Sequence, residues 1–261
     1  MTDALIINDV YADEILKVQA HRPYPLPAGP WIMQQTWHDL LFAHWPLPVE
    51  KVQAAMPPAL RKHIDVFEGS AWVGVIPFWM SGVKMRGMPA VPTASTFPEL
   101  NVRTYVTVGG KPGVYFFSLD AASKLAVYGA KIGFGLNYFH AKMAARVSGD
   151  QVQYESRRFE KQRPAEFVGS YAPENAKVFN AAKGSIEEFF VERYCLYTSH
   201  GPHIGRANIH HVPWPLQRAK ASIKTNTMAS AAEIELPKQK PHLMFAKDLD
   251  VLVWPLETAV R

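Results

Sequence analysis

The sequence predicts an α+β protein in which many antiparallel strands form a partly closed barrel around a few helices. Three observations carry this prediction. The 261 residues include 48% hydrophobic side chains, which is enough for one large core. Several short runs alternate apolar and polar residues between turns rich in Gly and Pro, and helical spacing is confined to a few segments. We therefore expect an N-terminal arm or helix over residues 1–21 and a single domain over residues 22–261.

Composition argues against several classes of partner and location. The single cysteine, Cys195, excludes an internal disulfide, and the acidic start of the chain is unlike a secretory signal, so we expect a cytoplasmic protein. No run approaches the roughly 18 apolar residues of a membrane span, and no membrane association is expected. The net charge is +5, but Lys and Arg are spread along the chain instead of forming a basic cluster. This distribution argues against a nucleic-acid partner. The expected partner is a small-molecule ligand, and a homo-oligomer is left open.

The N-terminal third is expected to contain a strand, a short helix and a hairpin. Aromatic residues from Trp31 onward are typical of a strand, and the helical spacing of VEKVQAA ends at a pair of prolines. Residues 64–80 hold two β-rich runs around Glu68-Gly69-Ser70, which predicts a hairpin. Residues 81–98 lack periodicity and are rich in Gly, Pro, Ser and Met, which predicts a long loop able to act as a lid.

The centre of the chain gives the clearest pattern. Residues 99–107 alternate strictly, a Gly-rich turn follows, and VYFFSLD resumes as a second strand of a hairpin. The segment 121–134 then places Leu125 and Ile132 on one helical face, which predicts a buried helix whose start is capped by Asp120 or Ser123.

The C-terminal half is predicted to be mostly strands. A hairpin is expected over residues 136–160 with its turn at Ser148-Gly149-Asp150, and the polar segment 161–183 is expected to be a loop. Residues 185–198 are typical of a short helix that runs into a strand, residues 205–219 of one further strand, and residues 236–257 of a last strand.

The central strand has one polar face. Residues two apart in a strand share a face, so Glu99, Asn101, Arg103 and Tyr105 point one way and their neighbours point the other. One interpretation is a solvated outer face. The other is that these side chains look into a cavity, where Arg103 would bind a carboxylate, Glu99 would neutralise it in the empty cavity, and burial would suit Glu99 to acid or base chemistry.

Four strings give the chain a recognisable relationship: PELNVRTYV, PGVYFFSLDA, AVYGAKIGFGLNYFHAKM and IHHVPWPL. From Arg22 to Leu256 the sequence resembles the YqjF-like family of bacterial proteins, which is in turn remotely similar to acetoacetate decarboxylase. The resemblance implies a cone-shaped β-barrel with an internal ligand cavity, and Glu99 matches a catalytic-site glutamate. Arg103 is the nearest candidate for the arginine of the decarboxylase site.

The resemblance also implies a lost reaction. Where the decarboxylase has Pro-Lys-Lys, this chain has Asn137, Tyr138 and Phe139, so the lysine that forms an imine with a ketone is missing. Schiff-base decarboxylation is therefore not expected. A displaced lysine remains an alternative, and the candidates in the neighbouring sequence are Lys124, Lys131 and Lys142. We expect Tyr138 and His140 to lie near the position of the lost lysine and to be catalytic residues together with Glu99.

Histidine patterns and glycine patterns argue against a metal or nucleotide cofactor. His210 and His211 are adjacent in a predicted strand and point to opposite faces, so they cannot readily bind one ion together. We expect one of them to face the cavity, with His210 among the substrate-binding residues, and the other to pack beneath Trp214. GAKIGFG lacks the spacing and helix-start position of a phosphate-binding loop, so no cofactor is expected.

Three functional hypotheses follow from these residues. The first is an enzyme acting on a small carbonyl or carboxylate compound, a lyase- or isomerase-like acid/base catalyst, with Glu99 as acid or base, Arg103 as anchor, and Asn101 and Tyr105 also in contact with substrate. The second is a binding protein of the same fold without catalysis. The third is a structural barrel in which aromatic side chains fill the cavity. Whether the protein is an enzyme is left open.

Overall fold

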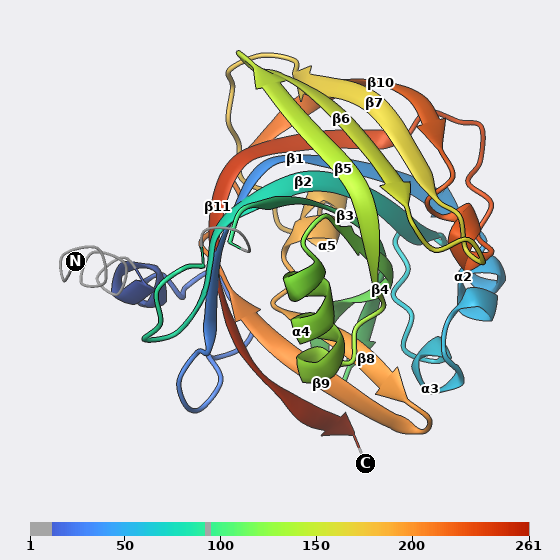
Figure 1. The fold of residues 1–261 in the computed structure, drawn as a ribbon. Coiled ribbons are helices and arrows are strands. Elements are labelled where there is room, and N and C mark those ends of the chain that lie inside the picture. The colour runs from blue at the N-terminus through green and yellow to red at the C-terminus, as the bar shows by residue number, and fades with distance from the viewer. Residues whose placement is uncertain (1–11, 92–94, 261) are drawn as a thin grey trace.

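A computed structural model describes residues 12–91 and 95–260 of the chain (Figure 1). The described residues form eleven strands, the four α-helices α2 to α5 and one 3-10 helix, η1. Residues 12–17 are also helical. The strands are β1 (Met33–Leu47), β2 (Ala71–Met85), β3 (Phe97–Val108), β4 (Lys111–Ala121), β5 (Tyr138–Ser148), β6 (Gln151–Arg158), β7 (Glu166–Pro173), β8 (Cys195–His200), β9 (His203–His210), β10 (Leu216–Asn226) and β11 (His242–Val260). The helices are α2 (Val49–Ala55), α3 (Pro58–Arg61), α4 (Lys124–Phe134), α5 (Ile186–Val191) and η1 (Ser230–Ala232).

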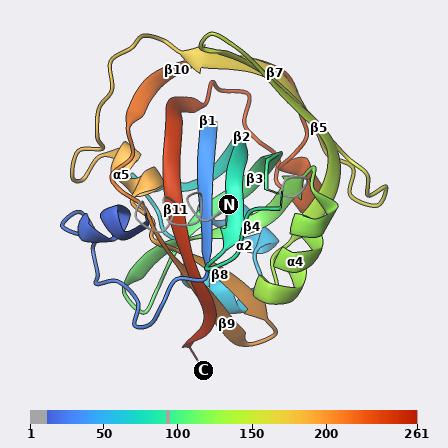
Figure 2. The same cartoon turned by 60° about the vertical axis from the view of Figure 1, so that its left-hand side comes forward.

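The strands join into two closed rings that share five strands. In the sheet order β1-β2-β3-β4-β5-β6-β7-β10-β11-β9-β8, additional pairings of β1 with β11 and of β4 with β8 close the circuits. One ring runs through β5, β6, β7 and β10, which arch over the upper side of the molecule, and the other runs through β8 and β9 below (Figures 1 and 2). The expected mainly antiparallel, partly closed architecture is confirmed; β4 pairs in parallel with β5 and β8.

Strand alternation gives the shared strands two different apolar faces. Leu41 and Ala43 of β1 and Val73 of β2 belong to one core cluster, which also contains side chains of β6 and β7. Phe42 of β1 and Phe78 of β2 belong to a second cluster, which faces α5 and the ring closed by β8 and β9. Both faces of these strands are buried. The first cluster therefore forms a hydrophobic core on one face, while the second ring encloses a cavity on the other.

The N-terminal expectations need two corrections. The turn at Glu68 and Gly69 is present, with positive φ at both residues, but residues 64–67 form only isolated bridges, one of them from Ile64 to Val106 of β3. The long loop expected over residues 81–98 is shorter, because β2 continues to Met85 and pairs there with the start of β1. Residues 92–94 of that segment lie outside the described residues, so a lid is not assigned.

Further corrections concern the helix after β4 and the C-terminal half. Helix α4 was expected to be buried, yet Leu125 is 66% and Tyr128 69% exposed, and Val127 turns inward. Asp120 does not cap it, because its carboxylate binds Arg158 on β6. The polar segment 161–183 contains β7, and residues 205–219 divide between β9 and β10 instead of forming one strand. The described residues include no helix with the length and apolar character of a membrane span.

Candidate functional site

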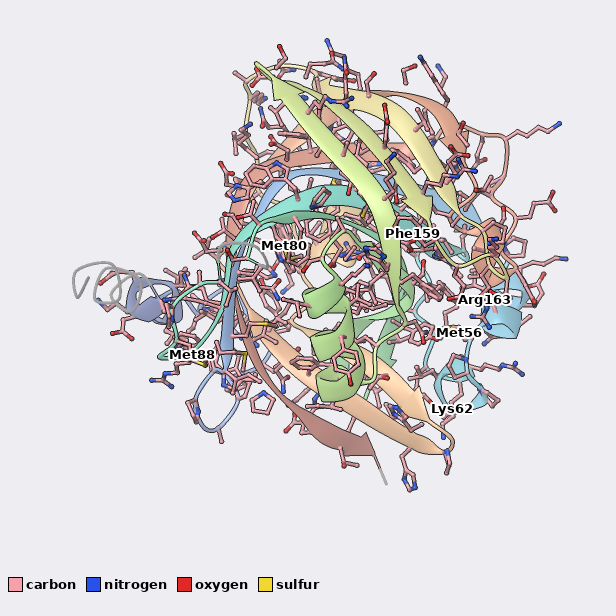
Figure 3. The ribbon with its side chains drawn as sticks, viewed as in Figure 1. Met56, Lys62, Met80, Met88, Phe159 and Arg163 are labelled. Atoms are coloured by element: carbon pink, nitrogen blue, oxygen red, sulfur yellow. The ribbon has the colours of Figure 1, made fainter. Side chains whose placement is uncertain are left out.

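A cavity of about 580 Å³ lies inside the ring formed by β1 to β4, β8, β9 and β11. Helices α4 and α5 contribute Phe134 and Phe190 to its wall, and most of the lining is apolar. Met80 of β2 is a lining residue in the interior, whereas Met88 lies on the projecting turn after β2 (Figure 3). The volume falls within the range of pockets that enclose metabolites and drug-sized ligands.

Strand register gives the cavity a depth axis. Met33 of β1 pairs with Met85 of β2 at the outer end of the lining. Moving inward along β2, successive rungs pair Met80 with Phe97, Phe78 with Glu99, Ile76 with Asn101 and Gly74 with Arg103. At about 3.3 Å of rise per residue, the backbone of Arg103 lies about 13 Å farther along β3 than that of Glu99. The polar residues of β3 therefore occupy different levels of one cavity.

The middle level is a cluster of three polar side chains. Tyr138, at the start of β5, donates its hydroxyl to Oε2 of Glu99 at 3.0 Å, and the Asn101 side chain also hydrogen-bonds to the Glu99 carboxyl. Tyr154 of β6 fixes the backbone beneath, because its hydroxyl donates to the carbonyl oxygen of Glu99 at 2.7 Å. Asn101 keeps its Oδ1 atom buried without a partner. The cluster therefore presents a carboxyl group to the cavity, whereas the Asn101 Oδ1 atom itself is closed off from it.

Glu99 is expected to keep its proton at neutral pH. The residue is 3% exposed, and burial raises the pKa of its carboxyl to about 8, outweighing the hydrogen bonds from Tyr138 and Asn101 that favour the ionised form. The negative charge of Asp120 raises the pKa further. Burial and the neighbouring carboxyl also raise the pKa of Tyr138, so its phenol stays protonated. A neutral carboxylic acid can donate a hydrogen bond to a ligand oxygen.

The floor of the cavity carries a positive charge. Arg103 donates from Nε to the hydroxyl of Tyr105 at 3.3 Å and from Nη2 to the carbonyl oxygen of Phe190 at 3.2 Å. Tyr105 in turn hydrogen-bonds to Nε2 of His44 at 2.5 Å, and burial lowers the pKa of His44 so that this ring is neutral. Within the part of the chain that the structure describes, no carboxylate forms an ion pair with Arg103.

A second arginine at the floor was missed by the sequence analysis. Arg193, which follows α5, lines the cavity, and its guanidinium forms an ion pair with Asp65. Both Arg103 and Arg193 lie over the ring of Tyr105, with centroid distances of 5.6 and 5.1 Å. Nothing in the spacing of residues 185–198 marks Arg193 as a cavity residue, because it approaches β3 only through the ring closure.

The sequence-predicted residues divide between the cavity and its surroundings. Glu99, Asn101, Arg103 and Tyr138 line it together. The expected neutralisation of Arg103 by Glu99 is wrong, because no ion pair joins them and they lie four positions apart along β3. Tyr105 shares their face of β3 but lies beneath Arg103, fully buried in the core.

Neither of the two predicted site histidines, His140 and His210, is among the described residues that line the cavity. The ring of His140 stacks on that of Phe159, with a centroid distance of 4.6 Å. His210 bonds to the carbonyl oxygen of Ile15 and to Arg22, in the N-terminal segment, so its predicted substrate contact is corrected. The cavity side of the pair is taken by His211, which packs against Trp214 at 5.3 Å. The alternation of the pair was predictable, but which histidine faces inward was not.

No lysine is among the described residues that line the cavity. Tyr138, which the resemblance placed near the lost lysine, lines the cavity and directs its hydroxyl to Glu99. Lys124 and Lys142 are exposed, and the side chain of Lys131 lies outside what the structure describes. Across residues 12–91 and 95–260, no three side chains of His, Cys, Asp or Glu gather as a metal site would require.

Comparison with solved structures identifies the class of fold. The chain is similar to acetoacetate decarboxylase from Legionella pneumophila, with a TM-score of 0.60, 13% identity and coverage of 94% of this chain and 95% of that one. It is also similar to an acetoacetate decarboxylase-like enzyme from Sphingomonas wittichii RW1, with a TM-score of 0.58, 11% identity and coverage of 91% and 97%. The enduracididine biosynthesis enzyme MppR, solved with a condensation product of pyruvate, gives a TM-score of 0.59 at 8% identity, with 88% and 90% covered. The fold is thus acetoacetate-decarboxylase-like.

Sequence comparison narrows this class to one family. Residues 34–250 match the profile of DUF2071, described as an uncharacterized conserved protein, and the chain belongs to this family. A relative from Bacillus subtilis (strain 168), named uncharacterized protein YqjF, is 46% identical over 231 residues, which span 88% of this chain and 94% of the relative. The YqjF-like relationship expected from the sequence is confirmed.

Proposed function

We propose that this protein binds a carboxylate compound that also carries a carbonyl or hydroxyl oxygen, and that Glu99 acts on it as a general acid or base without an imine. The observation that carries the proposal is that one cavity holds a buried Glu99, hydrogen-bonded by Tyr138, and an arginine without a carboxylate partner among the described residues. Arg103 supplies the charge that a ligand carboxylate needs, and a forked guanidinium can bind it through two parallel hydrogen bonds.

Glu99 and Tyr138 are placed for work on the ligand oxygen. As a neutral acid, Glu99 can donate its proton to a carbonyl or hydroxyl oxygen, and after donation the resulting carboxylate accepts the hydrogen bond from Tyr138. A pKa near 8 is close to ordinary working pH, which is where a general acid or base is most effective. The mechanism needs no lysine nucleophile, in agreement with the residues that line the cavity.

A binding protein without catalysis is the second candidate. It is favoured by the separation of Glu99 from Arg103, since the two groups do not converge on one point of a very small ligand. A purely structural ring is disfavoured, because its aromatic side chains leave a volume of about 580 Å³ open.

Ligand-dependent thermal stabilisation tests the binding part of the proposal. Across a panel of oxo acids, hydroxy acids and simple carboxylates, we expect at least one to raise the melting temperature of the wild-type protein in a concentration-dependent way. Arg103→Met should abolish this shift. A panel in which no carboxylate stabilises the wild type at millimolar concentration contradicts the proposal.

Catalysis is tested with the ligand that stabilises best. Glu99→Gln should still bind this ligand but should lose turnover followed by NMR, and retained turnover in Glu99→Gln contradicts the role of Glu99. Borohydride treatment with the same ligand should leave the mass of the protein unchanged. A reduced adduct on any lysine contradicts the absence of an imine.

A further inference from the structure

We infer that the ligand is an extended, largely apolar monocarboxylic acid, bound with its carboxylate at the floor, an oxygen substituent part-way along its chain, and its apolar end toward the outer rungs. This inference rests on the proposed function and specifies the ligand of the same site. It depends on the order in which charged, polar and apolar groups follow one another along the cavity.

The floor accepts one anionic group. Arg193 is already neutralised by Asp65, and His44 is neutral, so Arg103 supplies the unpaired positive charge. Two of its nitrogens, Nε and Nη2, donate to Tyr105 and to the Phe190 carbonyl, which orients the guanidinium instead of leaving it free to turn. Arg103 is half-buried, so its charge is partly removed from water, and an incoming carboxylate offsets that cost.

The middle level favours an oxygen that accepts a hydrogen bond. Protonated Glu99 offers a donor, whereas the Oδ1 atom of Asn101, on a side chain 8% exposed, is closed to a water-sized group. A hydroxyl or an oxo oxygen can accept the hydrogen bond from Glu99. The backbones of Arg103 and Glu99 are about 13 Å apart along β3. The Arg103 guanidinium bonds to Tyr105, the residue on the side away from Glu99, so a ligand that reaches both groups must be extended.

The walls are suited to a hydrocarbon body. Ile76, Phe116 and Leu119 line the depth between floor and middle, and Met80 and Phe97 line the rung outside Glu99. The volume of about 580 Å³ equals the liquid volume of roughly nineteen water molecules, far more than a three- or four-carbon acid displaces. A short acid would leave this apolar wall wet, whereas a longer chain would cover it.

A chain-length series tests the inference directly. Straight-chain acids from four to twelve carbons, each below its micelle concentration, would be titrated into the wild-type protein by calorimetry. We expect affinity to rise about fourfold per added methylene, the equivalent of about 0.8 kcal/mol, until the chain fills the cavity. A hydroxyl or oxo group at mid-chain should strengthen binding in the wild type more than in Glu99→Met, whose side chain has no hydrogen-bond donor.

Two variants test the orientation. Arg103→Met should weaken the acids at least tenfold and leave the corresponding primary alcohols nearly unchanged. Met80→Trp, which narrows the level outside Glu99, should weaken the twelve-carbon acid while the six-carbon acid binds as before. Met88→Trp is the matched control, because Met88 lies on the exposed turn after β2 and outside the described lining, and it should change neither.

The outcomes separate this inference from the proposed function. If a four-carbon oxo acid binds as tightly as the longer acids, the extended ligand is wrong while carboxylate binding stands. If no acid of any length binds, both fail together. If long acids bind but Arg103→Met weakens the alcohols equally, or Met80→Trp weakens short and long acids alike, the orientation is contradicted.

Discussion

At the scale of single residues, Glu99 couples the chemistry of the cavity to the stability of the fold. Its carboxyl has an ordinary pKa near 4.5 in the unfolded chain and a pKa of about 8 in the folded protein. The folded state therefore binds more protons than the unfolded state between these values, and the contribution of Glu99 to stability is fully present below pH 4.5 and declines as the pH rises to 8.

This linkage predicts a pH-dependent difference between the wild type and Glu99→Gln. The quantity to follow is the free energy of unfolding of the wild type minus that of the variant. This difference should fall between pH 4.5 and 8, with a maximum slope of about 1.4 kcal/mol per pH unit, and then level off. Urea unfolding of both proteins from pH 5 to 9 measures it. A difference that stays constant over this range contradicts a protonated Glu99.

Tyr138 affects the pKa of the same carboxyl group. Its hydrogen bond favours the ionised form, so Tyr138→Phe should raise the pKa of Glu99 further and move the end of the decline above pH 8. The lost hydrogen bond should also cost about 1 kcal/mol of stability at neutral pH. The control is Tyr128→Phe on the exposed face of α4, which should change neither quantity. A downward shift in the Glu99 titration would contradict this geometry.

At the scale of elements, a buried ion pair ties β4 to the hairpin that carries Tyr138. Arg158 of β6 donates from Nε and Nη2 to the two oxygens of Asp120 at 2.8 and 2.6 Å, and its guanidinium lies 3.8 Å from the ring centroid of Phe139. Both side chains are almost completely buried. The end of β4 and the start of β5 are thereby held side by side, next to Glu99.

Breaking this pair should destabilise the protein strongly. Asp120→Asn leaves Arg158 buried without its counter-ion. We expect the free energy of unfolding to fall by about 3–5 kcal/mol. Glu155→Gln is the control on the same hairpin, because Glu155 forms an exposed pair with Arg146 at 3.9 Å and should cost less than about 1 kcal/mol. Equal effects of the two substitutions would show that burial of the pair is not what stabilises this junction.

The elements also show what a sequence can and cannot predict. The alternation of residues 99–107 predicted the polar face of β3, because a two-residue period is a local property. Strand β7 lies in a polar segment and is defined by its pairing with β6 and β10, which is not local. Helix α4 was expected to be buried because apolar residues share one face, yet Leu125 is exposed, and the sequence does not show which face finds a covering element.

The candidate site divides in the same way. Glu99, Asn101 and Arg103 were predictable as one face of one strand, and the resemblance to a known family singled out Tyr138. Arg193 was not, because it enters the cavity only through the closure of the ring by β8 and β9. Contacts made by ring closure join residues that are far apart in the sequence, and a single sequence carries no local signal for them.

At the scale of the whole molecule, the N-terminal segment is fastened to β9 by histidines. Nε2 of His210 bonds to the carbonyl oxygen of Ile15 at 2.9 Å, and Nε2 of His21 bonds to the carbonyl oxygen of His211 at 2.8 Å. Burial lowers the pKa of His210 to about 4 and of His211 to about 3, with the positive charge of Arg22 acting in the same direction. These rings are therefore neutral in the folded protein at physiological pH.

Acidification should weaken this attachment. Because the pKa values of His210 and His211 are lowered on folding, the unfolded chain takes up protons first as the pH falls below about 6.5, and stability should decline from there to about pH 3 to 4. His210→Gln replaces a titrating ring by a neutral amide, so its free energy of unfolding should fall less steeply between pH 6.5 and 4 than that of the wild type, as measured by urea unfolding. His203→Gln, at an exposed position of the same strand, should leave the wild-type slope unchanged. An equal slope in His210→Gln and the wild type would mean that the histidine attachment does not set the acid sensitivity of the molecule.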